Sequence, residues 1–208
     1  MQRLIFARHG NTFDPGDKTV WVGRETDLPL VARGLAQAEE AALALIRREI
    51  QPAVIFTASL RRTRQFAAIV ADRLGSAPPV VDRRLDELDY GEWAGRSNDE
   101  ILAADPAAAS EMAGWNLADR WPEQARWGSR QASVMAELTT FIDERVRSGE
   151  GDILMVSSNG ILRFLPRLLL PLSEQRVSFK MRTGHLGMIE RDVGSARLEH
   201  WDVPPDSF

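Results

Sequence analysis

The sequence contains no cysteine, which excludes disulfide bonds, zinc–thiolate sites and a cysteine nucleophile. It also lacks any run close to the roughly 20 apolar residues of a membrane-spanning helix, and its first apolar stretch is too short for a signal peptide. An excess of basic charge is absent, since the formal net charge is -4. We therefore expect a cytoplasmic protein without a broad surface for nucleic acid or an anionic membrane, although this charge leaves room for a small anion pocket.

Short apolar runs alternate with segments of helical periodicity along most of the chain. The runs at 4–7, 53–57 and 153–156 are typical of buried strands, and the segments between them carry apolar residues at helical spacing. This alternation predicts an α/β fold, a three-layer sandwich with a mostly parallel central sheet and helices on both faces. The residues around 186–189 and 197–201 flank a Gly-containing turn and predict a final hairpin.

The length of 208 residues favours a single domain spanning 1–208. Residues 105–127 interrupt the regular pattern with prolines, glycines and charges, and we expect them to form an insertion that could act as a lid. Trp115, Trp121 and Trp127 lie in this stretch, and we interpret them as packing residues. This insertion is also where we expect substrate selection to occur.

Polar side chains follow the predicted strands, at the sheet edge where parallel sheets bind ligands. Arg8 and Arg62 predict a phosphoryl clamp, because a guanidinium group keeps its charge and offers paired donors to a phosphate dianion. His9 lies between them, and neighbouring positive charge should keep its imidazole neutral and nucleophilic. A loop carbonyl such as that of Gly10 could fix the tautomer.

Four motifs follow one another along the chain: Arg8-His9-Gly10-Asn11-Thr12, Gly23-x-x-x-Asp27-Leu-Pro29-Leu30 with Gly34 and Gln37-Ala38, Leu60-x-Arg62-x-x-Gln65-x-Ala67, and Leu85-x-Glu87 through Tyr90-Gly91-x-Trp93-x-Gly95. In this order they resemble the histidine phosphatase superfamily, which has the phosphoglycerate-mutase-like fold. The resemblance extends from about residue 2 to 170, and it implies that His9 is transiently phosphorylated, that Arg8 and Arg62 hold the phosphoryl group, and that Glu87 protonates the leaving oxygen.

One position departs from this family pattern. The family carries Ser-His-Gly after the strand that ends at Val156, and its histidine contacts the phosphoryl oxygens, whereas this chain has Ser158 in that slot. Losing a preorganised donor commonly costs about 10²- to 10³-fold in rate, so we expect attenuation. We expect Asn11, Ser158, Asn159 and His185 to bind phosphate, with Asn159 or His185 compensating in part for the missing imidazole.

The sequence thus predicts a phosphomonoester hydrolase acting through a phosphohistidine on a phosphorylated small molecule or a phosphoprotein. Two alternatives stay open. In the first, the chain is a weakened pseudo-phosphatase that binds a phosphorylated ligand; in the second, it is a phosphotransferase of the phosphoglycerate mutase type. We expect no cofactor and no metal site, because the three histidines lack the spacing of metal ligands.

Overall fold

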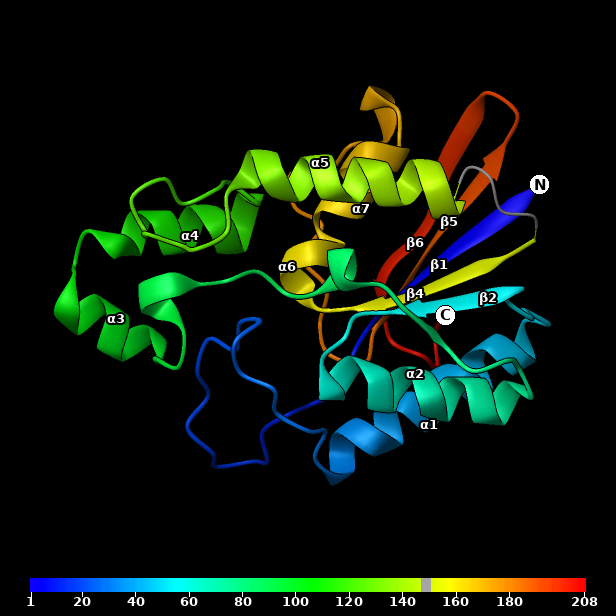
Figure 1. Cartoon of the computed structure of the whole chain (residues 1–208), viewed down its shortest axis with the longest axis horizontal. Helices are drawn as coiled ribbons and strands as arrows, with labels where there is room; N and C mark the ends of the chain where they lie inside the picture. The colour runs from blue at the N-terminus through cyan, green and yellow to red at the C-terminus, as the bar shows by residue number, and fades with distance from the viewer. Residues whose placement is uncertain (147–150) are drawn as a thin grey trace.

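The computed structural model describes residues 1–146 and 151–208. Six strands form one sheet in the order β3-β2-β4-β1-β5-β6, in which β3, β2, β4 and β1 pair in parallel and β5 and β6 add an antiparallel edge. The predicted α/β fold with a mixed, mainly parallel sheet and a C-terminal hairpin is therefore confirmed (Figure 1). The strands are β1 (Gln2–Arg8), β2 (Val54–Thr57), β3 (Val80–Val81), β4 (Ile153–Ser157), β5 (Leu186–Asp192) and β6 (Ser195–Val203).

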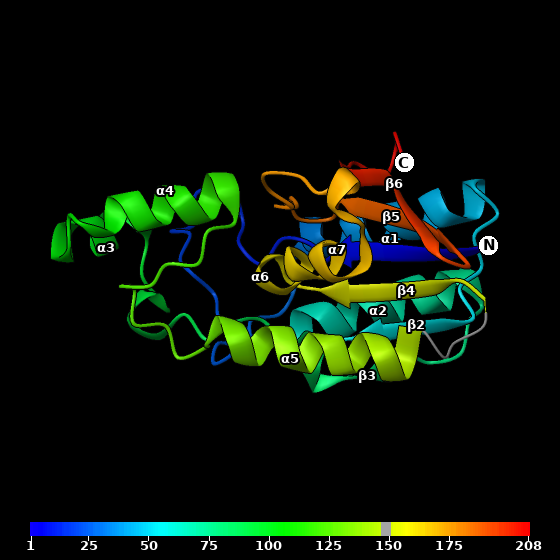
Figure 2. The same cartoon turned by 90° about the horizontal axis from the view of Figure 1, so that it is seen from above.

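Helices cover both faces of the sheet. Helices α1 and α2 lie on one face and α5 and α7 on the other (Figures 1 and 2). The helices are α1 (Ala32–Arg47), α2 (Arg61–Leu74), α3 (Asn98–Ala104), α4 (Ala108–Ala118), α5 (Gln131–Phe141), α6 (Asn159–Leu162) and α7 (Phe164–Leu169), with short helical turns at Arg83–Leu85, Gly91–Trp93, Ile142–Val146 and Leu172–Glu174.

The central strand β1 shows why its residues form a buried strand. Leu4 and Phe6 belong to the core under α5 and α7, whereas Ile5 and Ala7 belong to the core under α1 and α2. Successive side chains of a strand point to opposite faces, so a strand covered on both sides must be apolar throughout. This double burial positions the polar loop that follows β1 at the carboxyl edge of the sheet.

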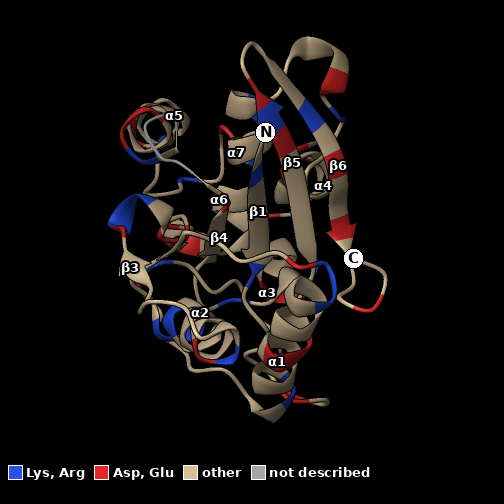
Figure 3. Cartoon of the chain, turned by 90° about the vertical axis from the view of Figure 1, so that its right-hand side faces the viewer, with Lys and Arg blue, Asp and Glu red and all other residues tan. Residues whose placement is uncertain are grey.

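Helix α1 has the predicted apolar face, with one exception. Ala38, Ala42 and Leu45 are fully buried, but Ile46, which we assigned to the same face, is 47% exposed. The alanines allow α1 to lie close to the sheet. Ile46 points outward because it lies 100° around the helix from Leu45, at the margin of the buried face. Charged residues of both signs occupy the outer surfaces of α1 and α2 (Figure 3).

Residues 105–127, which interrupt the regular pattern of the sequence, include helix α4 (Ala108–Ala118). Together with α3 it projects beyond the carboxyl ends of the strands (Figure 2). Helix α3 begins at a capping box in which the Ser97 hydroxyl accepts from Glu100 N and the Glu100 carboxylate accepts from Ser97 N. No helix in the described ranges has the length and apolar character needed to cross a membrane.

The tryptophans of this region pack together, as predicted. Trp127 lies edge-on to Trp115 and to Trp121, each at a centroid distance of 5.1 Å, and also contacts Trp21 at 6.1 Å and Trp93 at 5.6 Å. Such tilted ring pairs each add about 0.5–1.5 kcal/mol beyond area burial. The cluster joins the first loop, the Glu87 loop and the α4 region into one aromatic core.

Candidate active site

The polar residues predicted at the strand ends meet in a cavity of about 890 Å³. Arg8 and His9 follow β1, Arg62 opens α2 after β2, and Asn159 opens α6 after β4. All four line the cavity together with Glu87. Its outer walls come from residues 11–17 and 19–22 and from α3 and α4, so the cavity lies between the sheet edge and these two helices.

His9 has a buried imidazole with a defined tautomer. Its Nδ1 lies 2.8 Å from the carbonyl oxygen of Gly10, which is the contact predicted from the sequence. A carbonyl only accepts, so Nδ1 carries the proton and Nε2 keeps its lone pair. Burial, followed by the charges of Arg62 and Arg8, holds the pKa of His9 well below its ordinary value. The ring is therefore neutral at neutral pH, as the predicted nucleophile requires.

A close backbone contact holds the His9 loop in place. An added Cβ on Gly10 would lie 2.3 Å from the carbonyl oxygen of Gly34, and one on Gly34 would lie 2.2 Å from the carbonyl oxygen of Asn11. Both positions thus need glycine for steric reasons. Residues 9–11 consequently rest directly on the N-terminal turn of α1.

The two arginines are anchored through backbone carbonyls rather than carboxylates. Arg8 Nη1 donates to Met181 O at 2.7 Å, and Arg62 Nη1 and Nη2 donate to Thr26 O at 2.9 Å and Gly23 O at 3.3 Å. The Nε atoms of both side chains are buried without a hydrogen-bond partner in the described structure. Buried donors are normally satisfied, so these two guanidinium groups, which border the cavity, keep unused hydrogen-bonding capacity.

Glu87 lies in the same cavity with its carboxylate held by backbone donors. Its Oε1 accepts from Leu88 N at 2.9 Å and its Oε2 from Gly160 N at 3.2 Å. The hydroxyl of Tyr90 also donates to this carboxylate. Burial, followed by the negative charge of Glu87, raises the pKa of Tyr90 well above its ordinary value, so Tyr90 stays a donor. A cavity-facing carboxyl oriented in this way can exchange a proton with a leaving group.

Asn11 and Asn159 both line the cavity through amides whose oxygens are already used. Asn11 Oδ1 accepts from Thr183 Oγ1 at 2.5 Å, and Asn159 Oδ1 accepts from Met181 N at 2.9 Å. Each side chain therefore directs its NH₂ group to other partners. Both amides fit the predicted role of anion donors.

Ser158 is 1% exposed, and its Oγ has no hydrogen-bond partner in the described part of the chain. It occupies the N-cap position of α6 without making a side-chain cap. Ser158 therefore does not serve as a side-chain cap of the helix. Ser158 directly precedes the cavity-lining Asn159 but is itself not among the residues that line the cavity.

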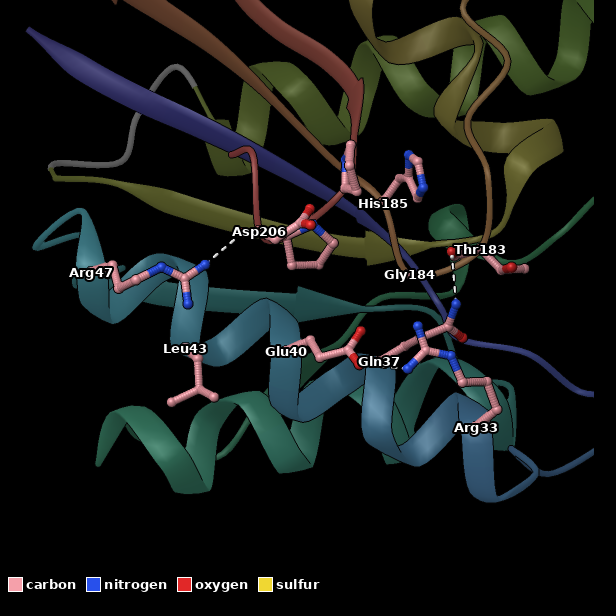
Figure 4. Close-up of a pocket in the computed structure, with 11 residues that line it drawn as sticks. Arg33, Gln37, Glu40, Leu43, Arg47, Thr183, Gly184, His185 and Asp206 are labelled. Carbon is pink, nitrogen blue, oxygen red and sulfur yellow. Dashed lines mark hydrogen bonds and ion pairs between the residues drawn. The ribbon is translucent and has the colours of Figure 1, made fainter.

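His185 lies elsewhere. Its Nδ1 is 2.9 Å from Asp202 O and 3.0 Å from Asp202 Oδ1, which orients the ring towards β6. His185 lines a second cavity of about 400 Å³ between α1 and the C-terminal tail (Figure 4). Thr183 borders both cavities, so any influence of His185 on the first one passes through the 183–185 segment.

Sequence reasoning missed three residues that shape the cavity. Tyr90 and Gln37 were noted only as parts of motifs. Gln37 bridges the His9 loop to the C-terminal segment, accepting from Asn11 N at 2.8 Å and donating to Thr183 O at 3.1 Å. Lys180 lines the cavity from a segment without regular structure.

Metal ligation has no visible basis in this site. Within residues 1–146 and 151–208, no group of three or more His, Asp or Glu side chains is placed to hold a metal ion. The chemistry available in the cavity is that of a neutral imidazole, a carboxyl group and fixed cationic donors.

Comparison with known proteins identifies the family. The family model of the histidine phosphatase superfamily (branch 1) matches residues 4–204. A glucosyl-3-phosphoglycerate phosphatase of Mycolicibacterium vanbaalenii is 30% identical over 185 residues, covering 83% of this chain and 76% of the relative. A 2,3-bisphosphoglycerate-dependent phosphoglycerate mutase of Methylobacterium radiotolerans is 30% identical over 191 residues, covering 88% and 87%.

Solved structures agree with this assignment. The structure of a mycobacterial glucosyl-3-phosphoglycerate phosphatase in complex with VO3 superimposes with a TM-score of 0.79 at 28% identity, covering 97% of this chain and 98% of that one. The chain therefore belongs to branch 1 of the histidine phosphatase superfamily, and it is an enzyme of the phosphatase type, acting on phosphate monoesters.

Proposed function

We propose that this chain hydrolyses phosphate monoesters through a phosphohistidine formed on Nε2 of His9. The observation that carries the proposal is the 2.8 Å contact between Nδ1 and Gly10 O, because it leaves Nε2 as the ring nitrogen with a free lone pair. The depressed pKa of His9 supports it, since a protonated ring would have no lone pair to give.

The reaction follows from the groups that line the cavity. The Nε2 lone pair attacks phosphorus, the bond to the ester oxygen breaks, and Glu87 gives its proton to that oxygen. Water then attacks the phosphohistidine while the Glu87 carboxylate takes a proton from it, which releases phosphate and restores Nε2. One residue serves as acid and then as base, and Arg8 and Arg62 stabilise the charge on the transferred oxygens.

Ser158 should lower the rate of this reaction, because it stands in the slot where the family carries a histidine. Its hydroxyl can donate one hydrogen bond to a phosphoryl oxygen but supplies no positive charge. We propose that Asn11 and Asn159 share the contact with that oxygen, which keeps the chain catalytic at a reduced rate. The orientation of both amides supports this role.

The experiment is hydrolysis of p-nitrophenyl phosphate between pH 5 and 8, comparing wild type with His9→Ala and Ser158→His. The proposal expects wild-type turnover well above the His9→Ala background, and rapid quenching should trap phosphate on His9. If wild type equals His9→Ala while Ser158→His gains turnover, the chain is instead the pseudo-phosphatase considered above.

The mutase alternative has its own observable. A relative of this chain carries the name of a phosphoglycerate mutase, and a mutase would return the phosphoryl group to the glycerate instead of releasing it. Phosphorus NMR of a 3-phosphoglycerate reaction separates the two, because a hydrolase accumulates inorganic phosphate.

On the sequence evidence we also propose one domain over 1–208, with 105–127 as the lid, and a cytoplasmic location.

A further inference from the structure

The side chain of Gln37 closes a ring of hydrogen bonds behind the catalytic cavity. Its Oε1 accepts from Asn11 N at 2.8 Å, and its Nε2 donates to Thr183 O at 3.1 Å, the bond drawn in Figure 4. Thr183 Oγ1 donates in turn to Asn11 Oδ1 at 2.5 Å. The ring therefore joins three elements, which are the loop after β1, helix α1 and the segment before β5.

Gln37 reaches the reaction only through its partners. It is 9% exposed and borders the second cavity, and it is not among the described residues that line the catalytic cavity. Asn11 and Thr183 do line the catalytic cavity. Gln37 thus lies behind the wall that a bound phosphate ester would contact.

The orientation of the Gln37 amide is dictated by the groups that face it. A backbone N–H only donates and a carbonyl only accepts, so the amide oxygen must face Asn11 and the amide nitrogen must face Thr183. An added Cβ on Gly184 would lie 2.8 Å from both Cβ and Cδ of Gln37. The side chain is therefore held by close packing against Gly184 as well as by its hydrogen bonds.

The segment that Gln37 binds also holds the backbone of the catalytic loop. Gly184 N donates to Arg8 O at 3.1 Å and to His9 O at 3.2 Å, and Arg8 N donates to His185 O at 3.2 Å. A displacement of this segment would consequently displace Arg8 and His9. Because Gln37 is bonded to the segment and to the loop, it fixes the separation between them.

We propose that Gln37 is a positioning residue for phosphoryl transfer, which holds Nε2 of His9 and the amide of Asn11 in the geometry that the reaction requires. This inference rests on the proposed hydrolase function and adds to it a residue outside the catalytic cavity. Positioning matters here because Ser158 supplies no positive charge, so the rate depends on where the remaining donors lie.

Gln37→Met removes both hydrogen bonds and keeps a side chain of similar length. A shift of about 1 Å in a reacting group commonly costs about 10²-fold in rate. We therefore expect kcat for p-nitrophenyl phosphate to fall by about 10- to 100-fold, with KM within about threefold of wild type. The change in KM is small because the side-chain anchors of Arg8 and Arg62 do not involve Gln37.

Gln37→Glu gives a readout that a purely structural role would not produce. An ionised glutamate can accept from Asn11 N but turns its second oxygen towards Thr183 O, whereas a protonated one donates to that carbonyl as glutamine does. Burial and the facing carbonyl should raise the pKa of the introduced carboxyl. The kcat of Gln37→Glu relative to wild type should therefore rise by about 10-fold or more between pH 8 and pH 5.

Wild type measured at each pH removes the effect of other ionisations from this ratio. The charged and titratable groups around Gln37 come from α1, from the segment before β5, from the C-terminal tail and from the catalytic loop, and they are present in both proteins. They are Arg33, Glu40, Arg47, His185, Asp206, Arg8 and His9.

Gln65→Met is the matched control. Gln65 lies on α2, and its Oε1 accepts from Leu30 N at 2.9 Å, so this variant also removes a bond between a glutamine and a loop N–H. Neither of these two residues is among the described residues that line the catalytic cavity. The kcat of Gln65→Met should stay within about twofold of wild type. If Gln37→Met loses no more than Gln65→Met, or if the Gln37→Glu ratio does not depend on pH, the positioning role is overturned.

A failure of the hydrolase proposal is recognised separately. If wild type does not exceed the His9→Ala background on p-nitrophenyl phosphate, calorimetric binding of orthovanadate, which mimics a transferring phosphoryl group, replaces kinetics. Gln37→Met must then bind vanadate about 10-fold or more weakly than Gln65→Met for the positioning role to stand. Equal dissociation constants, or no binding to any of the three proteins, overturn it.

Discussion

Gly160 is the position at which a single methyl group should separate proton donation from phosphoryl binding. An ideal Cβ at Gly160 would lie 2.2 Å from Glu87 Oε1, 2.9 Å from Leu88 Cδ1 and 2.9 Å from the Tyr90 hydroxyl oxygen. Real Cβ atoms essentially never approach another atom below 3.0 Å. Because Leu88 and Tyr90 block the alternatives, Gly160→Ala must displace the Glu87 carboxylate.

The size of the effect follows from the displacement. The carboxylate must move by roughly 1 Å, and a misplacement of that order commonly costs about 10²-fold in rate. General acid catalysis is worth about 10²- to 10⁴-fold when the leaving group needs a proton. We therefore expect Gly160→Ala to lower kcat by about 10²- to 10³-fold on an alkyl phosphate such as glycerol 3-phosphate.

The assay compares leaving groups. Glycerol 3-phosphate releases a poor leaving group that depends on the Glu87 proton, whereas p-nitrophenyl phosphate releases an anion that is stable without it. Gly160→Ala should therefore lose about 10-fold or less on p-nitrophenyl phosphate. Equal losses on the two substrates would refute the reasoning, because they would show that the whole cavity, rather than the proton donor, had been disturbed.

Gly75→Ala is the matched control. Gly75 caps α2 at φ +60°, and nothing lies within 4 Å of the added Cβ. The change should cost about 1 kcal/mol of stability through left-handed backbone strain and leave both rates as in wild type. Urea unfolding of both variants shows that each is folded under the assay conditions.

Two further predictions concern ionisation and the buried charges. Because the folded protein depresses the pKa of His9, the imidazole should stay neutral below pH 6.5. The free energy of unfolding should therefore fall as the pH drops below about 6.5, where only the unfolded chain takes up that proton. A ring that titrates near 6.5 in ¹⁵N-histidine NMR, with His9→Gln for assignment, would contradict this. Asp119→Ala should cost about 3–5 kcal/mol by leaving Arg163 unpaired in the core, measured by urea unfolding, whereas Glu190→Ala on the half-exposed pair with Arg197 should cost under about 1 kcal/mol.

The strands, the helical faces and the convergence of Arg8, His9 and Arg62 could all be predicted from the sequence. Each rests on a local rule, since burial on both sides demands continuous apolar residues and parallel strands present their ends at one edge. Even the tautomer of His9 was predictable, because the next residue supplies the carbonyl.

Helix α4 and Lys180 illustrate what local rules miss. Ala108, Met112 and Trp115 form the buried stripe of α4, but alanine on the other faces hides the contrast that periodicity needs, and Gly114 weakens the helical signal. Lys180 follows no strand or helix, so only contacts distant in sequence, to Asn116 and around Asp119, position it. His185 was expected near the phosphate, and its ring is instead oriented by Asp202.

The aromatic cluster gives this enzyme a built-in optical reporter. Five of the six tryptophans, all except Trp201, are connected through Trp127 within 6.1 Å or less, and Trp21 and Trp115 border the catalytic cavity. Indole emission is sensitive to nearby charge and hydration, so a phosphorylated compound that enters should change the fluorescence of the unlabelled protein. Ligands can thus be screened before any substrate is known.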